Sequence, residues 1–269
     1  MIKVELKRVM AMVKTALITG ASHGIGLELA RVFAENGYQL VLVARNSRRL
    51  REIKDEFQRT LSTSVDIIAK DLSEPDAPRE LFAELTDRNL NIDALVNNAG
   101  YGWKGQFAKG NPDTQLDMID LNVRALTYLT RLALPSMVAA KGGYILNVAS
   151  TAAFQPGPLM AVYYATKAYV LSFSEAIGNE VREYGITVTT LCPGPTSTEF
   201  ASRANMSTSR LFQGSGVMDA KTVAKLGYEG MMKGRTIVIP GVRNQVLAAS
   251  TRFAPRRAVT RIARSLNEG

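Results

Sequence analysis

The sequence predicts a single α/β domain with a doubly wound, seven-stranded and mostly parallel sheet that carries helices on both faces. The first reason is a regular alternation, in which short apolar runs are followed by longer segments with apolar residues at helical spacing. The second is that the short runs are almost continuously apolar, which is typical of parallel strands buried on both faces. The third is size, because 269 residues with 46% hydrophobic and 21% charged side chains suit one large globular domain.

Seven strands are expected along the chain, separated by helices. Asn46 and Asp219 precede two of these helices and are expected to cap them, whereas Glu74-Pro75 is expected to open another. Two long helices are expected at about 112–138 and 161–184. In such sheets ligands bind beyond the C-terminal ends of the strands, so residues directly after each strand are the first candidates for a site. The expected strands cover residues 15–19, 39–44, 65–69, 92–96, 144–149, 186–191 and 236–239.

A glycine-rich turn, Thr19–Gly26, follows the first strand and opens the first helix. A helix N-terminus offers unpaired N–H groups and partial positive charge, and glycines let the backbone approach a phosphate closely. The spacing is G-x-x-x-G-x-G, without the lysine that follows the last glycine of a P-loop. The turn therefore favours a dinucleotide site, with a purely structural turn as the alternative.

Composition removes several classes of function. The chain has one cysteine, Cys192, and one histidine, His23, which exclude an internal disulfide, a histidine-dependent triad and most zinc sites. No apolar run reaches the roughly 18 residues that a membrane span needs, and the N-terminus lacks the apolar core of a secretion signal. We expect a cytoplasmic protein without a metal.

Much of the net charge of +9 lies near the C-terminus, where the arginines from Arg243 to Arg264 are opposed only by Glu268. Such a basic segment can bind nucleic acid or an anionic membrane surface. A solvated helix face that also attracts a phosphate-bearing cofactor is the simpler interpretation. We therefore expect no nucleic-acid partner and keep contact with a membrane surface as an alternative.

Tyr163 and Lys167 are four residues apart and share one face of a predicted helix. Ser150 ends the fifth strand and can face the same cleft. A phenol is a poor proton shuttle at neutral pH, but a nearby ammonium and a cationic nicotinamide ring would lower its pKa. The serine hydroxyl can hold the substrate oxygen that gains or loses the proton. Together these groups suit hydride transfer beside a dinucleotide.

With these motifs the sequence resembles the short-chain dehydrogenase/reductase family, in its single-domain, NADP-type branch. The resemblance covers about residues 14 to 239. The matching features, in family order and spacing, are the turn Thr19–Gly26, Asn97-Asn98-Ala99-Gly100, Asn122, Ser150, Tyr163 with Lys167, and Pro193-Gly194.

The resemblance implies catalytic roles for four residues. Tyr163 would be the general acid in carbonyl reduction and the base in alcohol oxidation. Lys167 would lower the pKa of Tyr163 and bind the nicotinamide ribose. Ser150 would orient the substrate oxygen, and Asn122 would hold a water molecule that links Lys167 to solvent. The fold implied is a Rossmann fold.

The resemblance also implies a cofactor site along the ends of the strands. Asp71 would bond the adenine amino group, with Leu72 beside it. The segment Asn98–Gly100 would line the adenosine side, and Pro193, Gly194 and Thr196 would border the nicotinamide, with Thr198 near it or near the phosphates. The full expected set is Gly20, Ser22, His23, Gly24, Ile25, Gly26, Arg45, Asp71, Leu72, Asn98, Ala99, Gly100, Tyr163, Lys167, Pro193, Gly194, Thr196 and Thr198.

The second strand ends in Val43-Ala44-Arg45, without the carboxylate that would bind the ribose hydroxyls of NAD. Arg45 can pair with a 2′-phosphate and stack on adenine, and Ser22 and Asn46 could add hydrogen bonds. His23 departs from the arginine or lysine often found there in NADP-dependent members. We therefore expect NADP(H) rather than NAD(H).

The expected function is interconversion of a ketone or aldehyde, including a 3-oxoacyl or other apolar carbonyl, with its alcohol. The alternatives are an NAD-linked alcohol or hydroxysteroid dehydrogenase and a non-catalytic dinucleotide sensor. Met160, Phe154 and Trp103 are candidates for the substrate pocket. A homo-oligomer is expected from the resemblance. The expected divisions are an N-terminal extension over 1–13, a Rossmann-type catalytic domain over 14–240 with a substrate flap at about 198–216, and a basic helical extension over 241–269.

Overall fold

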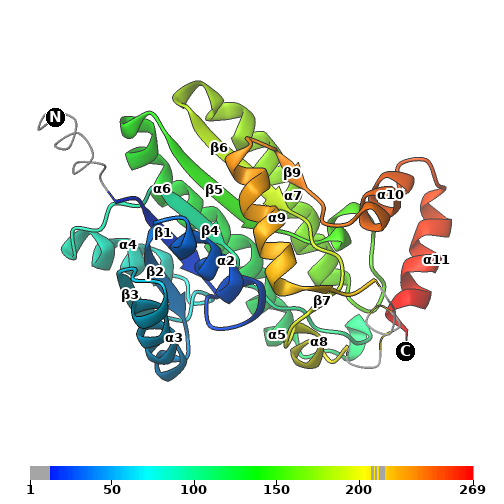
Figure 1. The fold of residues 1–269 in the computed structure, drawn as a ribbon. Coiled ribbons are helices and arrows are strands. Elements are labelled where there is room, and N and C mark those ends of the chain that lie inside the picture. Colours follow the sequence, from blue (N-terminus) through cyan, green and yellow to red (C-terminus); the bar gives the residue numbers. More distant parts are fainter. Residues whose placement is uncertain (1–12, 207–208, 210, 212–215, 269) are drawn as a thin grey trace, which may run out of the picture.

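The computed structural model describes residues 13–206, 209, 211 and 216–268. Its centre is a seven-stranded sheet in the order β3-β2-β1-β4-β5-β6-β9, and all of its strand pairs are parallel (Figure 1). The predicted fold class is therefore confirmed. The strands are β1 (Thr15–Thr19), β2 (Gln39–Ala44), β3 (Val65–Ala69), β4 (Ala94–Asn97), β5 (Gly143–Val148), β6 (Ile186–Leu191) and β9 (Ile237–Val238).

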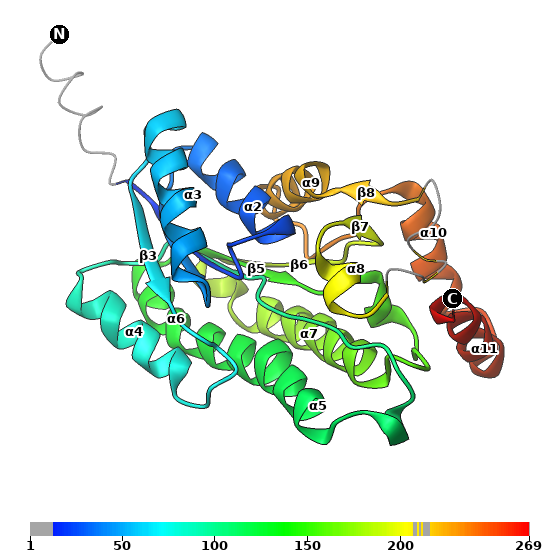
Figure 2. The ribbon, with the colours of Figure 1, turned by 90° about the horizontal axis from the view of Figure 1, so that it is seen from below.

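Helices cover both faces of the sheet, as Figure 2 shows. On one face α2 (Gly24–Glu35), α3 (Ser47–Thr60) and α9 (Ala220–Met232) pack against Ile18 and Leu42. On the other face Leu17 and Val41 pack against α4 (Ala77–Asp87) and α6 (Leu126–Ala140). Neighbouring residues of one strand thus enter different cores, because side chains alternate across a sheet. This explains why the strands are apolar along their whole length.

Helix starts follow local side-chain chemistry. The Asn46 side chain accepts a hydrogen bond from the N–H of Arg49 at 3.0 Å, and Asp219 accepts one from Thr222 at 2.8 Å, so both predicted caps are confirmed. Helix α4 begins at Ala77 and not at Glu74-Pro75; its first turn holds Pro78, whose missing N–H costs nothing there.

The predicted long helix at 112–138 is interrupted by a wider turn. It consists of α5 (Pro112–Ile119), a π-helical segment (Asp120–Ala125) and α6. Helix α7 (Ala161–Glu180) is followed by a short 3-10 turn at Arg182–Tyr184. Periodicity did not predict the π segment, because one inserted residue leaves the apolar spacing on either side intact.

Polar side chains also cross the interior between β4 and β5. Asn97 and Asn147 lie opposite each other in the register of this strand pair. Asn97 Nδ2 donates to Asn147 Oδ1 at 2.9 Å and to Thr130 Oγ1 at 3.1 Å, and Asn147 Nδ2 donates to Ser174 Oγ at 2.8 Å. This chain, the buried amide ladder, ties the sheet to α6 and α7.

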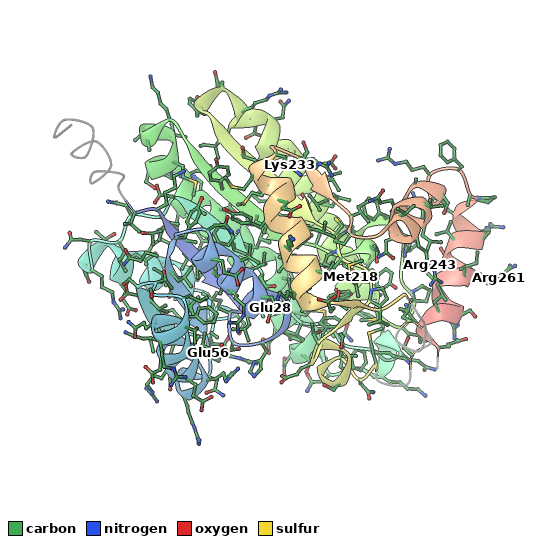
Figure 3. The ribbon with its side chains drawn as sticks, viewed as in Figure 1. Glu28, Glu56, Met218, Lys233, Arg243 and Arg261 are labelled. Carbon is green, nitrogen blue, oxygen red and sulfur yellow. The ribbon has the colours of Figure 1, made fainter. Side chains whose placement is uncertain are left out.

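After β9 the chain forms two helices, α10 (Val242–Ser250) and α11 (Arg256–Asn267), which lie together at one end of the molecule in Figures 1 and 2. Arg261 points outward from α11 in Figure 3. Across the residues that the structure describes, no helix is long and apolar enough to cross a membrane. The division into domains stays a prediction, and most of the expected N-terminal extension, residues 1–12, lies outside the described residues.

Candidate active site

A large cavity of about 840 Å³ runs along the C-terminal ends of the strands. One end is lined by Arg45 and Asp71, after β2 and β3, and the other by Ser150 and Tyr163, after β5 and on α7. The glycine turn after β1 lines the middle. The sheet therefore gathers residues from distant parts of the sequence along one edge, as parallel α/β folds do.

The glycine turn is held by Asn98. Its Nδ2 atom donates to the carbonyl oxygens of Thr19 and Gly20 at 3.0 and 3.1 Å. Gly20 has a φ of +65°, and a Cβ atom there would lie 2.8 Å from Asn98 Nδ2. At Gly26 a Cβ would lie 2.3 Å from the carbonyl oxygen of Gly20. Only glycine therefore permits this close packing of turn, helix and Asn98.

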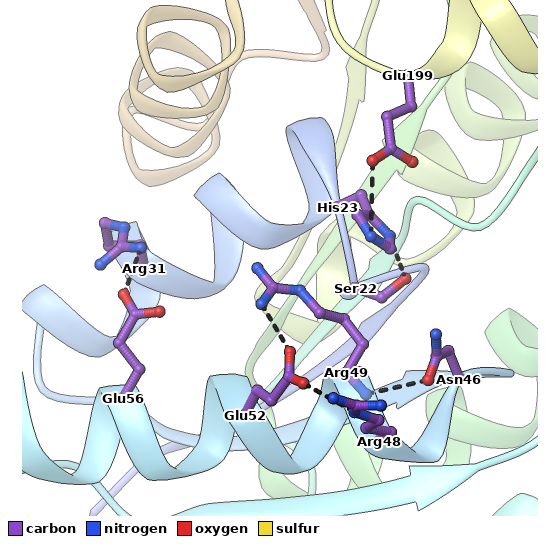
Figure 4. Close-up of polar contacts among 9 residues, drawn as sticks. All are labelled: Ser22, His23, Arg31, Asn46, Arg48, Arg49, Glu52, Glu56 and Glu199. Carbon is purple, nitrogen blue, oxygen red and sulfur yellow. Dashed lines mark hydrogen bonds and ion pairs between the residues drawn. The ribbon is translucent and has the colours of Figure 1, made fainter.

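The N-terminus of α2 faces the cavity through Gly24 and Ile25. Its N-cap residue, His23, makes no side-chain cap, and its first turn holds no acidic residue. In Figure 4 the His23 ring lies between Ser22 and Glu199, with Nδ1 3.0 Å from Ser22 Oγ and Nε2 3.7 Å from Glu199 Oε1. The backbone N–H groups of this turn suit an anion such as a diphosphate.

At the far end of the cavity, Arg45 Nη1 lies 3.5 Å from Asp71 Oδ2. The Arg45 side chain is 76% exposed, so its charge is available to a ligand. Asp71 Oδ1 also accepts hydrogen bonds from the N–H and hydroxyl of Ser73. Burial alone would raise the pKa of Asp71, but the bonds from Ser73 and the charge of Arg45 outweigh it and lower the pKa. A carboxylate thus stands beside the guanidinium at neutral pH.

Ser150, Tyr163 and Lys167 meet at the other end. The Ser150 hydroxyl accepts from the N–H of Ala152 at 3.1 Å and donates to the carbonyl oxygen of Pro193 at 3.4 Å. Burial raises the pKa of Tyr163, and a hydrogen bond with Ser150 only partly offsets it. The effect of Lys167 on that pKa, which the resemblance implies, stays a prediction. The group can hold and deliver a proton at the Tyr163 hydroxyl.

Lys167 is buried, and its Nζ atom donates to the carbonyl oxygen of Val148 at 2.9 Å. Burial lowers its pKa to about 8. A Cβ atom at Gly100 would lie 3.5 Å from this Nζ and 2.8 Å from Asn122 Oδ1. A glycine at position 100 therefore leaves room for both side chains.

Asn122 lies in the π-helical segment and is 1% exposed. Its Oδ1 accepts from the N–H of Tyr101 at 3.1 Å, while its Nδ2 donates to the Tyr101 carbonyl oxygen at 2.9 Å and to Thr166 Oγ1 at 3.1 Å. These contacts fasten the strand-end segment after β4 to α7. The predicted role of Asn122 in holding a water molecule stays a prediction.

All predicted site residues except Gly26 and Asn122 line the cavity. Gly26 is buried in the packing of the turn and Asn122 behind Gly100. Of the three substrate-pocket candidates only Met160 lines the cavity. Phe154 packs in a different cluster, and Trp103 packs against the buried cluster of Met160 and Tyr163 without lining the cavity. The expected flap lies in part outside the described residues (207, 208, 210 and 212–215). The cavity is also lined by Lys70, Ser73, Tyr101, Asp117, Thr151, Gln155, Tyr164, Glu199, Ala263 and Leu266.

The wall beyond Tyr163 is apolar. The rings of Tyr163 and Phe200 have centroids 5.3 Å apart, and Met160 and Met206 belong to the same buried cluster. The two α11 residues that line the cavity, Ala263 and Leu266, are also apolar. Helical spacing in the sequence puts these last two residues on one apolar face, which could cover the pocket, form a subunit interface or contact a membrane surface; spacing alone does not choose among these.

These features fit a dinucleotide. The cavity joins an uncapped helix N-terminus, suited to phosphates, to an acid–base group at one end and an exposed arginine at the other. Fold and cavity together define a dinucleotide-binding oxidoreductase fold. The family model of short chain dehydrogenases matches residues 14–208, and the chain belongs to the short-chain dehydrogenase/reductase family. It is thus an enzyme, an oxidoreductase.

Three proteins illustrate the similarity. An oxidoreductase of Staphylococcus epidermidis without an assigned activity is 29% identical over 211 residues, 78% of this chain and 90% of that protein. The very-long-chain 3-oxoacyl-CoA reductase of Bos taurus is 33% identical over 190 residues, 69% of this chain and 60% of that protein. The 17-beta-hydroxysteroid dehydrogenase type 3 of Mus musculus is 34% identical over 193 residues, 71% of this chain and 62% of that protein.

Two solved structures share the fold over most of both chains. A short-chain dehydrogenase from Sphingobium yanoikuyae in complex with NADPH has a TM-score of 0.80 at 31% identity, covering 90% of this chain and 94% of that one. The bulky-bulky ketone specific alcohol dehydrogenase from Comamonas testosteroni has a TM-score of 0.76 at 29% identity, covering 90% and 92%.

Proposed function

We propose that the protein is an NADP(H)-dependent reductase of neutral, apolar ketones, including 3-oxoacyl compounds, and catalyses the reverse alcohol oxidation when alcohol is in excess. The observation that carries the proposal is the convergence of Ser150, Tyr163 and Lys167 at the end of the cavity that is closed by apolar side chains. When bound, the cofactor supplies the hydride, and the chain supplies position and the proton.

The three residues would divide the work of proton transfer. Ser150 Oγ, held by the N–H of Ala152, would turn its one hydrogen from the Pro193 carbonyl oxygen to the substrate carbonyl oxygen. The Tyr163 hydroxyl would transfer its proton to that oxygen. The phenol is protonated at neutral pH, as a general acid must be, but its burial makes the proton harder to release. The Lys167 ammonium would then stabilise the phenolate that forms.

The preference for NADP(H) rests on Arg45. Its guanidinium is exposed at the adenosine end of the cavity, and β2 ends without a carboxylate. A 2′-phosphate would compete with Asp71 for this guanidinium, and two negative partners suit an arginine with five donors. The complex of a structural neighbour with NADPH supports the same choice.

The substrate class rests on the lining of the Tyr163 end. Among the described residues that line the cavity, the cations are Arg45, Lys70 and Lys167, which lie at the adenosine end or beside Tyr163. Apart from Lys167, whose Nζ atom donates to the Val148 carbonyl oxygen, the Tyr163 end therefore offers apolar contact and no basic side chain for an anionic substituent. The names of the relatives, which refer to hydroxysteroids and very-long-chain 3-oxoacyl-CoA, agree with a carbonyl on a large carbon skeleton.

The test is to follow NADPH and NADH consumption with a panel of ketones, aldehydes and 3-oxoacyl thioesters, using Tyr163→Phe as the blank. We expect NADPH consumption by the native protein, no turnover by Tyr163→Phe, and nearly equal NADPH affinity for both when binding is measured by cofactor fluorescence. Strong residual turnover in the variant would remove Tyr163 from its proposed role. Tight NADPH binding without consumption of any compound would overturn the substrate class and favour a dinucleotide sensor.

A further inference from the structure

The last turn of α11 is anchored in the interior by Asn267. This asparagine is fully buried, although it lies at the end of a helix whose outer face carries arginines. Its Oδ1 atom accepts a hydrogen bond from the Tyr164 hydroxyl at 3.2 Å, and its Nδ2 atom donates to the carbonyl oxygen of Pro158 at 2.9 Å. A buried amide with a donor and an acceptor both satisfied fixes a position more strictly than apolar contact does.

Tyr164 is the neighbour of Tyr163 on α7 and lines the same cavity. Its ring lies so close to Gly157 that a Cβ atom there would be 2.2 Å from the ring. The loop before α7, the helix itself and α11 therefore meet around one tyrosine. Since position 168 is an alanine, Tyr164 has no lysine four residues later to support proton transfer.

A second bond ties α11 to the flap. Ser209 is fully buried, and its Oγ atom donates to the carbonyl oxygen of Leu266 at 3.0 Å. Leu266 and Ala263 line the cavity, and Ala263 lies one turn before Asn267 on the same face of α11. The bonds of Asn267 and Leu266 thus hold Ala263 against the substrate end.

We propose that α11 is the specificity-determining wall of the substrate pocket: Ala263 sets the size of the apolar group accepted beyond the carbonyl, and Tyr164 is a positioning residue that holds this wall through Asn267. The inference rests on the proposed function and names a substrate feature for that site. A ketone with a large apolar group on its far side would contact α11. A small ketone would be held by Ser150 and Tyr163 without reaching it.

The first experiment fills the space at Ala263. The probes are cyclopentanone as the small ketone and valerophenone as the large one, each with NADPH. In Ala263→Leu the ratio of kcat/KM for valerophenone to that for cyclopentanone falls about tenfold, because the added methylenes occupy the room of the larger substituent. Ser265→Leu, which introduces the same side chain on the exposed side of the same helix, leaves the ratio unchanged. An unchanged ratio in Ala263→Leu would overturn the proposal.

The second experiment removes one hydroxyl. Tyr164→Phe keeps the ring that packs on Gly157 and loses only the bond to Asn267, so α11 loosens. We expect faster hydrogen–deuterium exchange in the peptide 256–268 and a KM for valerophenone raised about fivefold relative to that for cyclopentanone. The matched control is Tyr169→Phe on the same helix, whose hydroxyl lies 3.0 Å from Thr127 Oγ1 at the surface.

The exchange measurement needs no turnover, which separates this inference from the proposed function. If the native protein reduced neither ketone, the proposed substrate class would fail, and faster exchange in Tyr164→Phe alone would still show that Tyr164 holds α11. If both ketones were reduced but Tyr164→Phe and Tyr169→Phe had equal exchange and equal KM ratios, the positioning role of Tyr164 would be wrong.

Discussion

Lys167 lies one turn along α7 from Tyr163, and its Nζ atom is 5.8 Å from the centroid of the Tyr163 ring. Both side chains are buried, with 6% and 9% of their surfaces exposed. Burial raises the pKa of the tyrosine and lowers that of the lysine to about 8. At neutral pH a cation therefore lies beside a protonated phenol; burial makes release of the phenol's proton harder, and the cation is the group that would stabilise the phenolate.

The buried charge of Lys167 should cost stability. Its pKa is about 8 in the folded protein and 10.5 ordinarily, so the unfolded chain binds more protons between these values. The contribution of this group to stability thus increases as pH rises from about 8 to 10.5. We expect Lys167→Met to lack this increase, which is on the order of 3 kcal/mol. Urea unfolding of both proteins at neutral pH and near pH 10 measures it.

The control for that experiment is Lys221→Met, because Lys221 is exposed on α9. The difference in the free energy of unfolding between Lys221→Met and the native protein should be the same at both pH values. A pH-independent difference between Lys167→Met and the native protein would show that burial does not depress the pKa of Lys167.

Arg45→Asp should weaken NADPH binding much more than NADH binding. The variant replaces a guanidinium that can pair with a 2′-phosphate by a carboxylate that repels it. A charge-assisted hydrogen bond is worth about 1.5–3 kcal/mol, so we expect a loss of about tenfold or more for NADPH alone. Titration of cofactor fluorescence gives both dissociation constants. Arg59→Asp, an exposed change near the C-terminal end of α3, the helix that follows Arg45, is the control. Equal losses for the two cofactors in Arg45→Asp would exclude contact with the 2′-phosphate.

Gly26→Ala should destabilise the fold, although Gly26 does not line the cavity. Its Cβ would lie 2.3 Å from both the Gly20 carbonyl oxygen and Asn98 Nδ2, so the turn and β4 must move apart. Overpacking of this kind costs about 1–3 kcal/mol. Thermal unfolding of the cofactor-free protein measures it. Gly142→Ala is the matched variant, because its Cβ would meet only the Ala140 carbonyl oxygen, at 4.0 Å; similar melting temperatures for the two variants would contradict the expectation.

Asn122→Ala should also reduce stability, by about 2–4 kcal/mol, because it leaves the N–H and carbonyl oxygen of Tyr101 and the Thr166 hydroxyl without their partner. Asn111→Ala serves for comparison. Asn111 caps α5 at the surface, and loss of such a cap costs about 1 kcal/mol. In chemical denaturation the free energy of unfolding of Asn122→Ala should therefore be well below that of Asn111→Ala. The reverse order would mean that the buried hydrogen bonds of Asn122 contribute little to stability.

Much of the fold followed from local pattern. The ranges of β1, β2, β3 and β6 match the predicted ones, because a strand buried on both faces is apolar along its whole length. The last strand is shorter than predicted, at Ile237–Val238, since only these two residues pair with β6. A segment that leaves the sheet but remains buried is still apolar, so the apolar pattern predicts a longer strand than the structure contains.

The site was predictable where the sheet alone positions its residues, as with Ser150 at the end of β5 and Arg45 at the end of β2. It was not predictable where distant segments meet. Tyr164 and Asn267 are 103 positions apart, and no spacing rule connects them. The sequence itself shows only that Tyr164 follows Tyr163 and has an alanine four residues later.

The buried amide ladder has a consequence for how the sheet assembles. Strands that are apolar on both faces can slide past each other with little loss of apolar contact, so hydrophobicity specifies their register weakly. A slip of β4 against β5 would separate Asn97 from Asn147 and strand two amides among aliphatic side chains, at about 1–3 kcal/mol for each group. The two asparagines therefore favour the native alignment of β4 and β5. Folding intermediates with these strands out of register are destabilised at the centre of the sheet, even when no ligand is bound.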